Sequence, residues 1–177
     1  GGTNDEEEVE VITAGEGRNI VLGDCGRIDF TRADRDEDAA GADTDPTDID
    51  FIESSSTTGS GGVDHITTGS GSDLIIGGRS GDRIEAGSGN NLVIGDSGRI
   101  TAAATDGPQL TGILMTLGLI ETLADNDGGD DTITTGVGYD IILGGQGGDS
   151  LTANVGETSR TRDAGNIVFG DSGLIDY

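Results

Sequence analysis

The 177-residue chain contains 34 glycines, three phenylalanines, two tyrosines and no tryptophan, and this composition argues against an ordinary compact core with aromatic packing. Its formal net charge of −25 makes nucleic acid an improbable partner and makes divalent cations the expected counter-charge. The single cysteine, Cys25, permits no intrachain disulfide, and no apolar run is long enough to span a membrane.

The first segment, about residues 5–28, contains two short apolar stretches, one around Ile12 and one at Ile20–Leu22. Each stretch lies next to a glycine-containing turn, a pattern that predicts short β-strands. We expect these strands to belong to the first turns of a repeat structure.

An insertion of about residues 29–59 follows, and its many acidic residues are typical of a solvated loop. Its ends, residues 27–30 and 49–52, alternate apolar and polar side chains and could pair as a hairpin. A calcium-binding EF-hand formed by Asp34, Asp36 and Asp38 is not expected, because Ala39 stands where that loop requires glycine.

The segment of about residues 60–100 is an internal repeat with a period of nine. One column of the aligned blocks holds Asp64, Asp73, Asp82 and Asn91, and a second column, two residues later, holds Ile66, Ile75, Ile84 and Val93. Each block therefore joins a glycine-rich turn to a short strand with an apolar centre. Because no block can bury its apolar residue alone, we expect the blocks to stack as parallel coils.

A second insertion, about residues 101–127, contains an apolar stretch at 110–123. Its glycines and β-branched residues favour a strand, although a helix remains open. The nine-residue pattern then resumes over about residues 128–153, with Asp131, Asp140 and Asp149 in the carboxylate column. A third insertion, about 155–163, precedes the last repeat segment, about 164–175.

The repeat resembles the glycine-rich nonapeptide G-G-x-G-x-D-x-U-x of the repeats-in-toxin (RTX) calcium-binding proteins. With partial copies at both ends, the resemblance covers a little over half of the chain. It implies an all-β protein, a parallel β-roll or β-helix solenoid with two blocks per coil, interrupted by inserted loops or hairpins. It also implies several Ca²⁺ ions in the turns.

The residue types support calcium independently of the resemblance. Ca²⁺ prefers six to eight oxygen ligands, and a turn of glycines exposes backbone carbonyls while one aspartate per turn adds charge. In a coil of eighteen residues Asp64 would stack over Asp82, Asp73 over Asn91, and Asp131 over Asp149, so the carboxylates would repel one another without cations between them. A metal-free series of Gly-Asp turns is the alternative.

A longer unit is also repeated, with Asn19, Asn91 and Asn166 spaced 72 and 75 residues apart. We therefore interpret all 177 residues as one repeat segment cut from a tandem array. In these copies asparagine replaces the aspartate of the repeat, and Asp24, Asp96 and Asp171 replace the second glycine of the following block. A standard ion site is in doubt there, although the new aspartate could restore the lost charge.

The candidate metal ligands combine the carboxylate columns with the polar residues of the longer unit. They are Asn19, Asp24, Asp64, Asp73, Asp82, Asn91, Asp96, Asp131, Asp140, Asp149, Asn166 and Asp171.

Alternate repeat blocks differ in the residues that flank the buried position. Blocks such as Leu74–Ile76 are apolar at all three positions, and because two blocks form one coil, these blocks share one face and give it an apolar stripe. A stripe of that length needs a cover. Cover by the second insertion is favoured over lateral association of chains, and the candidate covering residues are Ile113, Leu114, Leu117 and Ile120.

No catalytic motif is present, so an enzyme is not expected. The single histidine, His65, is interpreted as an outward polar residue of a strand, and the glycine-serine runs lack the helix that a dinucleotide loop requires.

The leading hypothesis is a calcium-dependent structural segment of a large secreted or cell-surface protein, serving adhesion, matrix building or extension. Its expected partners are calcium ions and either neighbouring repeats or other copies of the chain. The alternatives are a calcium-dependent secretion and folding module of an RTX enzyme or toxin, and an ice-binding solenoid. The last is suggested by Thr67-Thr68 and Thr132-Ile-Thr134 and weakened by Arg83-Ile-Glu85 in the same column.

Overall fold

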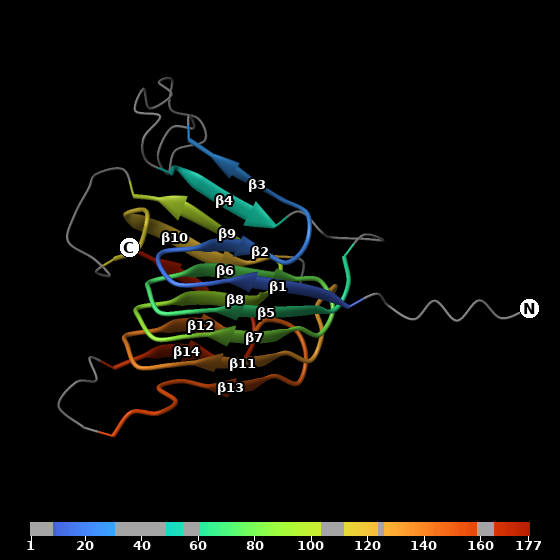
Figure 1. Ribbon diagram of the computed structural model, residues 1–177. Coiled ribbons are helices and arrows are strands. Elements are labelled where there is room, and N and C mark those ends of the chain that lie inside the picture. Colours follow the sequence, from blue (N-terminus) through green and yellow to red (C-terminus); the bar gives the residue numbers. More distant parts are fainter. Residues whose placement is uncertain (1–8, 31–48, 55–60, 104–111, 124–125, 159–164) are drawn as a thin grey trace, which may run out of the picture.

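The computed structural model describes residues 9–30, 49–54, 61–103, 112–123, 126–158 and 165–177. Within these ranges the chain forms fifteen strands and no helix, so the prediction of an all-β fold is confirmed. The strands make three five-stranded sheets, called sheets A, B and C below (Figure 1). The acidic residues Asp34, Asp36 and Asp38 lie outside the described residues, as does the start of the apolar stretch at 110–123.

Sheets A and B contain only parallel strands, and successive repeat blocks alternate between them. In spatial order, sheet A consists of β1 (Glu10–Ala14), β5 (Asp64–Thr68), β7 (Arg83–Ala86), β11 (Thr132–Thr135) and β13 (Ser150–Thr152). Sheet B consists of β14 (Ile167–Phe169), β12 (Ile141–Leu143), β8 (Leu92–Asp96), β6 (Leu74–Gly78) and β2 (Ile20–Leu22). The alternation is consistent with a β-roll of two blocks per coil, although neither sheet closes on itself.

The central residues of the inner blocks are buried between sheets A and B, whereas Val168 in the last block is 48% exposed. Ile66, Ile84 and Ile133 are in register on adjacent strands of sheet A, and they pack against the central residues of sheet B. This core contains Val21, Ile66, Ile75, Ile84, Ala86, Val93, Ile133 and Ile142. Full burial of one such aliphatic side chain stabilises the fold by about 1.5–3 kcal/mol.

Sheet C is antiparallel and is formed by strands that leave the repeat. In spatial order it consists of β15 (Leu174–Asp176), β10 (Leu117–Thr122), β9 (Gly98–Ala102), β4 (Phe51–Ser54) and β3 (Gly26–Asp29). β3 and β4 pair as the predicted hairpin, with Arg27 opposite Glu53 and Ile28 opposite Ile52. The second insertion supplies β10, so residues 117–122 of its apolar stretch form a strand, and the described part of that stretch contains no helix.

Sheet C covers the outer face of sheet B. The outward side chains of the three central sheet-B strands are Leu74, Ile76, Leu92, Ile94, Ile141 and Leu143, and each is at most 1% exposed. They pack against Ile52, Ile100, Leu117 and Ile120 of sheet C. The apolar stripe is therefore covered within the chain, by both long insertions and not by the second alone.

This three-layer arrangement explains the two kinds of repeat block. Sheet B is buried on both faces, so β6 and β8 are buried at every position. Sheet A has one open face, and β5 alternates between buried and exposed residues. His65 is one of the exposed residues, as predicted. The described residues include no helix long and apolar enough to cross a membrane.

The turns between strands approach one another closely at their glycines. Gly71 and Gly89 occupy equivalent places in neighbouring turns. Their φ values are +140° and +134°, which residues other than glycine rarely adopt. A Cβ atom on Gly89 would lie 2.0 Å from the carbonyl oxygen of Gly71. The glycines therefore permit the close stacking that places carboxylates and carbonyl groups of successive turns together.

Candidate metal centres

The turns lie along two edges of the paired sheets A and B. Edge one consists of the turns that lead from sheet B to sheet A, and its column residues are Asp64, Asp82, Asp131 and Asp149. Edge two consists of the turns that lead from sheet A to sheet B, and its column residues are Asn19, Asp73, Asn91, Asp140 and Asn166. All four members of the edge-one column are carboxylates, whereas asparagine and aspartate alternate along edge two.

The aspartates of edge one are stacked by hydrogen bonds from backbone to side chain. Oδ1 of Asp82 accepts from the backbone N–H of Asp64 at 2.8 Å, and Oδ1 of Asp131 accepts from that of Asp82 at 2.7 Å. Oδ1 of Asp149 accepts from the N–H of Asp131 at 2.9 Å. The predicted stacking of Asp64 over Asp82 and of Asp131 over Asp149 is therefore found, and the column also continues across the second insertion.

The second carboxylate oxygen of each edge-one aspartate is buried without a donor. Oδ2 of Asp64, Asp82, Asp131 and Asp149 has no hydrogen-bond partner among the described residues. Buried acceptors are normally satisfied, and an unsatisfied one carries a desolvation penalty of about 1–3 kcal/mol or more when it is charged. Four equivalent oxygens in this condition indicate a site for a cation.

Backbone carbonyls converge on the same oxygens. A Cβ atom on Gly77 would lie 2.4 Å from Oδ2 of Asp82 and 2.1 Å from the carbonyl oxygen of Gly95. The same arrangement recurs at three further glycines, where the neighbouring oxygens belong to Asp64 and Gly77 at Gly23, Asp131 and Gly144 at Gly95, and Asp149 and Gly170 at Gly144. Only glycine leaves room for a carboxylate and a carbonyl oxygen to meet there.

The electrostatics of edge one are unfavourable in the absence of positive charge. Burial, with a smaller contribution from neighbouring carboxylates, raises the pKa of Asp82 to about 9 and that of Asp131 to about 8, although a backbone N–H acts in the opposite direction on each. Burial and the charge of Asp24 raise the pKa of Asp64 to about 6. A divalent cation would reverse this balance, because it favours the ionised carboxylates that it binds.

The side chains do not form a metal chelate on their own. No group of three or more His, Cys, Asp and Glu residues with the arrangement to hold a metal occurs within the described ranges. The donor set of edge one instead combines a single aspartate per turn with backbone carbonyls. Such oxygen-only sets suit Ca²⁺, which tolerates flexible coordination by carboxylates and carbonyls.

Asp24 and Asp96 have a different role from the column residues. Asp24 accepts from the backbone N–H of Gly62 at 3.1 Å through Oδ1 and from that of Arg79 at 2.6 Å through Oδ2. Asp96 makes the equivalent bonds with the N–H groups of Gly129 and Gln146. Gly62 and Gly129 lie where the chain returns from an insertion, so each carboxylate closes a turn that the insertion has interrupted.

These aspartates do not restore the charge that the asparagines lack. Asn19 precedes β2 and Asp24 follows it, so the two side chains stand on opposite edges. The same holds for Asn91 and Asp96 at the two ends of β8. Asp171 is exposed at the corresponding place after β14, where its charge contributes to raising the pKa of Asp149, after the larger effects of burial and Asp130.

Edge two has the same backbone-to-side-chain stacking. Oδ1 of Asn91 accepts from the N–H of Asp73 at 3.1 Å, and Oδ1 of Asp140 accepts from that of Asn91 at 2.9 Å. Asn166 continues the column by accepting from the N–H of Asp140 at 2.8 Å. Oδ2 of Asp140 also accepts from the Thr135 hydroxyl at 2.7 Å, a contact that the sequence pattern did not indicate.

The sequence also left the carbonyl ligands unnamed. Gly77, Gly95, Gly144 and Gly170 each supply an oxygen to edge one. Gly77 and Gly95 lie in the last two residues of β6 and β8, and Gly144 and Gly170 directly follow β12 and β14. Their recurrence after every Ile/Leu/Val-rich block is the signal that could have identified them.

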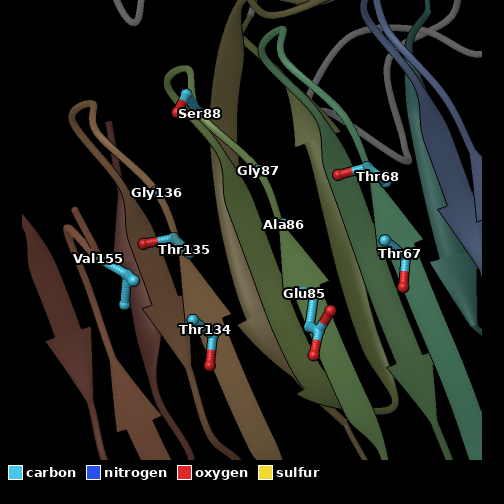
Figure 2. Close-up of a pocket in the computed structure, with 10 residues that line it drawn as sticks. All are labelled: Thr67, Thr68, Glu85, Ala86, Gly87, Ser88, Thr134, Thr135, Gly136 and Val155. Atoms are coloured by element: carbon cyan, nitrogen blue, oxygen red, sulfur yellow. The ribbon is translucent and has the colours of Figure 1, made fainter.

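A shallow hollow of about 270 Å³ lies on the open face of sheet A (Figure 2). Thr67, Glu85 and Thr134 stand in register on three adjacent strands that line it. Glu85 is the one ionisable residue of its lining and is paired with Arg83. The hollow therefore offers no acid-base pair, and Glu85 interrupts the threonine row that an ice-binding surface would need.

A comparison with protein families matches the RTX calcium-binding nonapeptide repeat, in four copies, over residues 58–93 and 125–157. No curated protein and no solved structure matches the chain in these comparisons. The matched ranges contain every edge-one column residue. They also contain Asp73, Asn91 and Asp140 of edge two.

Proposed function

Because the chain carries RTX calcium-binding nonapeptide repeats, we propose that it is a calcium-dependent structural segment of a larger secreted or cell-surface repeat protein. The proposed role of the parent protein is adhesion, matrix building or extension, and the segment itself performs no catalysis. RTX repeats bind calcium, and proteins that contain them are typically secreted.

The row of unsatisfied oxygens on edge one carries this proposal. Oδ2 of Asp82 and the carbonyl oxygen of Gly95 face the same space beside Gly77, and the same arrangement recurs for the other three column aspartates. These residues would hold the ions, which supply the positive charge that the stacked carboxylates lack. Without that charge, burial of several ionised carboxylates in one column opposes folding.

The longer unit supports an array over a single terminal module. After each of β2, β8 and β14 the chain enters a strand of sheet C, namely β3, β9 or β15. A unit of four parallel strands followed by a covering strand therefore recurs, as β5–β8 before β9 and as β11–β14 before β15. In the parent sequence, further copies of this unit would support the array, and a catalytic domain beside it would favour the secretion and folding module of an RTX enzyme or toxin.

Far-ultraviolet circular dichroism with and without a chelator tests the calcium dependence. Extracellular calcium sites bind at about 10⁻⁴–10⁻³ M, so 10 mM Ca²⁺ is about a tenfold to hundredfold excess and stabilises one site by roughly 1.4–2.7 kcal/mol. We expect both the β-structure signal and the melting temperature to be markedly lower in chelator than in 10 mM Ca²⁺. Mg²⁺ at the same concentration is the control and should not replace Ca²⁺, because it demands a smaller octahedral site. An unchanged spectrum and melting temperature in chelator would refute the proposal.

A further inference from the structure

The asparagines of edge two use their side-chain amides to close their own turns. Nδ2 of Asn91 donates to the carbonyl oxygen of Gly87 at 3.0 Å and to that of Gly89 at 3.2 Å. Nδ2 of Asn19 donates to the carbonyl oxygens of Gly15 and Gly17, both at 3.1 Å. In both turns the acceptors lie four and two residues before the asparagine, so the arrangement is the same.

Asp73 occupies the equivalent place in the turn between those of Asn19 and Asn91. Gly69 and Gly71 stand four and two residues before it, and its neighbour Leu74 is in register with Leu92. Asp73 is fully buried, and its Oδ2 has no hydrogen-bond partner among the described residues. An aspartate in this turn therefore presents an acceptor where an asparagine presents a donor.

The chemistry of the two residues accounts for the difference. Asparagine and aspartate have nearly the same shape, but the amide nitrogen carries two hydrogens and the carboxylate oxygen carries none. Carbonyl oxygens that converge on a carboxylate need a cation between them, whereas carbonyl oxygens that converge on an amide nitrogen already have their donor.

We infer that the side-chain amides of Asn19 and Asn91 take the place of a calcium ion in their turns, so that these turns close without metal. The inference rests on the proposed calcium-binding function, which assigns ions to the aspartate turns. It divides the molecule into an edge of four stacked carboxylates that needs ions and an edge that is partly closed by its own side chains.

Two further contacts agree with this division. Nδ2 of Asn19 also lies 2.9 Å from Oδ1 of Asp73, so one of its two hydrogens is shared between its own turn and the neighbouring carboxylate. The turn of Asp140 contains a protein donor too, the hydroxyl of Thr135. Edge two, as far as the structure describes it, has two column carboxylates, Asp73 and Asp140. Oδ2 of Asp140 has a protein donor, whereas Oδ2 of Asp73 has none among the described residues.

Asn91→Asp tests the inference by converting the amide donor into an acceptor. Calorimetric titration with Ca²⁺ should show one more ion bound per molecule than in the wild type, and the melting temperature in chelator should fall. Asn90→Asp is the control, because it adds the same charge one residue away. Oδ1 of Asn90 accepts from the backbone N–H of Tyr139 at 2.9 Å, and aspartate retains that acceptor.

The outcomes separate the inference from the proposed function. If the wild type binds no Ca²⁺, the proposed function fails. If the wild type binds Ca²⁺ and the two variants bind equal numbers of ions, the proposed function stands and the inference is overturned. Should Asn91→Asp not fold in calcium because residue 91 is fully buried, Asn19→Asp carries the same test at a turn that is only partly buried.

Discussion

Replacing Asp82 by asparagine should have opposite effects on the metal-free and the calcium-bound protein. Asp82 is 2% exposed, its Oδ1 accepts from the N–H of Asp64, and its Oδ2 has no donor among the described residues. Asparagine can keep the first bond through Oδ1. Its amide nitrogen can then donate to carbonyls of its own turn, as that of Asn91 does.

The expected gain in the metal-free state follows from the pKa of Asp82. Burial raises that pKa from 3.8 to about 9, so at neutral pH the folded protein must take up a proton that the unfolded chain does not hold. Binding that proton at pH 7 opposes folding by up to about 4 kcal/mol, because one pKa unit corresponds to about 1.4 kcal/mol. Asp82→Asn removes this penalty. In 10 mM Ca²⁺ the same substitution instead removes a ligand, and loss of one site then costs roughly 1.4–2.7 kcal/mol.

Urea unfolding, followed by circular dichroism in chelator and in 10 mM Ca²⁺, measures both effects. Asp36→Asn is the control for charge, because it removes one negative charge outside the repeat columns. We expect Asp82→Asn to be more stable than this control in chelator and less stable in calcium. A change of the same sign in both conditions would show that Asp82 acts through general charge and not as an ion ligand.

Three further perturbations probe the other elements of the structure. Because the pKa values of Asp82 and Asp131 are raised, the stability of the metal-free state is greatest at low pH and is lost as pH rises through about 8–9. Melting in chelator should therefore occur at a higher temperature at pH 5 than at pH 8. In limiting calcium the order should reverse, because calcium binds the ionised carboxylates. Ile94→Ala should destabilise the calcium-bound monomer by about 2–5 kcal/mol in thermal melts, because Ile94 is fully buried. Val11→Ala is the control and should have little effect, since Val11 is 74% exposed. Equal effects of the two substitutions would contradict the burial of Ile94 beneath sheet C. Asp96→Ala should lower the free energy of unfolding by about 1–3 kcal/mol in a denaturant titration, because two backbone N–H groups lose their acceptor. An unchanged free energy would exclude the turn-closing role of Asp96.

The repeat strands and the first hairpin could be predicted from sequence because local patterns determine them. The nine-residue period places every block, and the alternation at residues 27–30 and 49–52 indicates an antiparallel pair. Sheet C as a whole could not be predicted, because its registers join distant segments. β10 pairs with both β9 and β15, and Arg99 of β9 forms ion pairs with Glu53 and Glu121 on the two flanking strands.

The carboxylate columns could also be predicted, but not the separate roles of residues within the longer unit. Asn19 and Asp24 are five residues apart and look like parts of one modified site. The three-residue strand between them carries the chain from edge two to edge one, so they serve different turns. The donor role of Asn19 was also hidden, because an alignment of blocks shows a lost carboxylate and does not show where the amide nitrogen points.

The position of the insertions gives the two edges different consequences for the whole fold. Both long insertions leave the repeat on edge one, after Asp24 and after Asp96. The chain returns at Gly61 and Gly128, which lie against these same two aspartates and three residues before the column aspartates. Sheet C is therefore attached to the repeat through the edge that we expect to hold ions. Loss of those ions would loosen the turns that anchor sheet C. Because sheet C excludes solvent from the outer face of sheet B, that apolar face would then be exposed. The asparagine turns lie on the opposite edge, where closure by protein donors can hold successive coils in register without placing the cover.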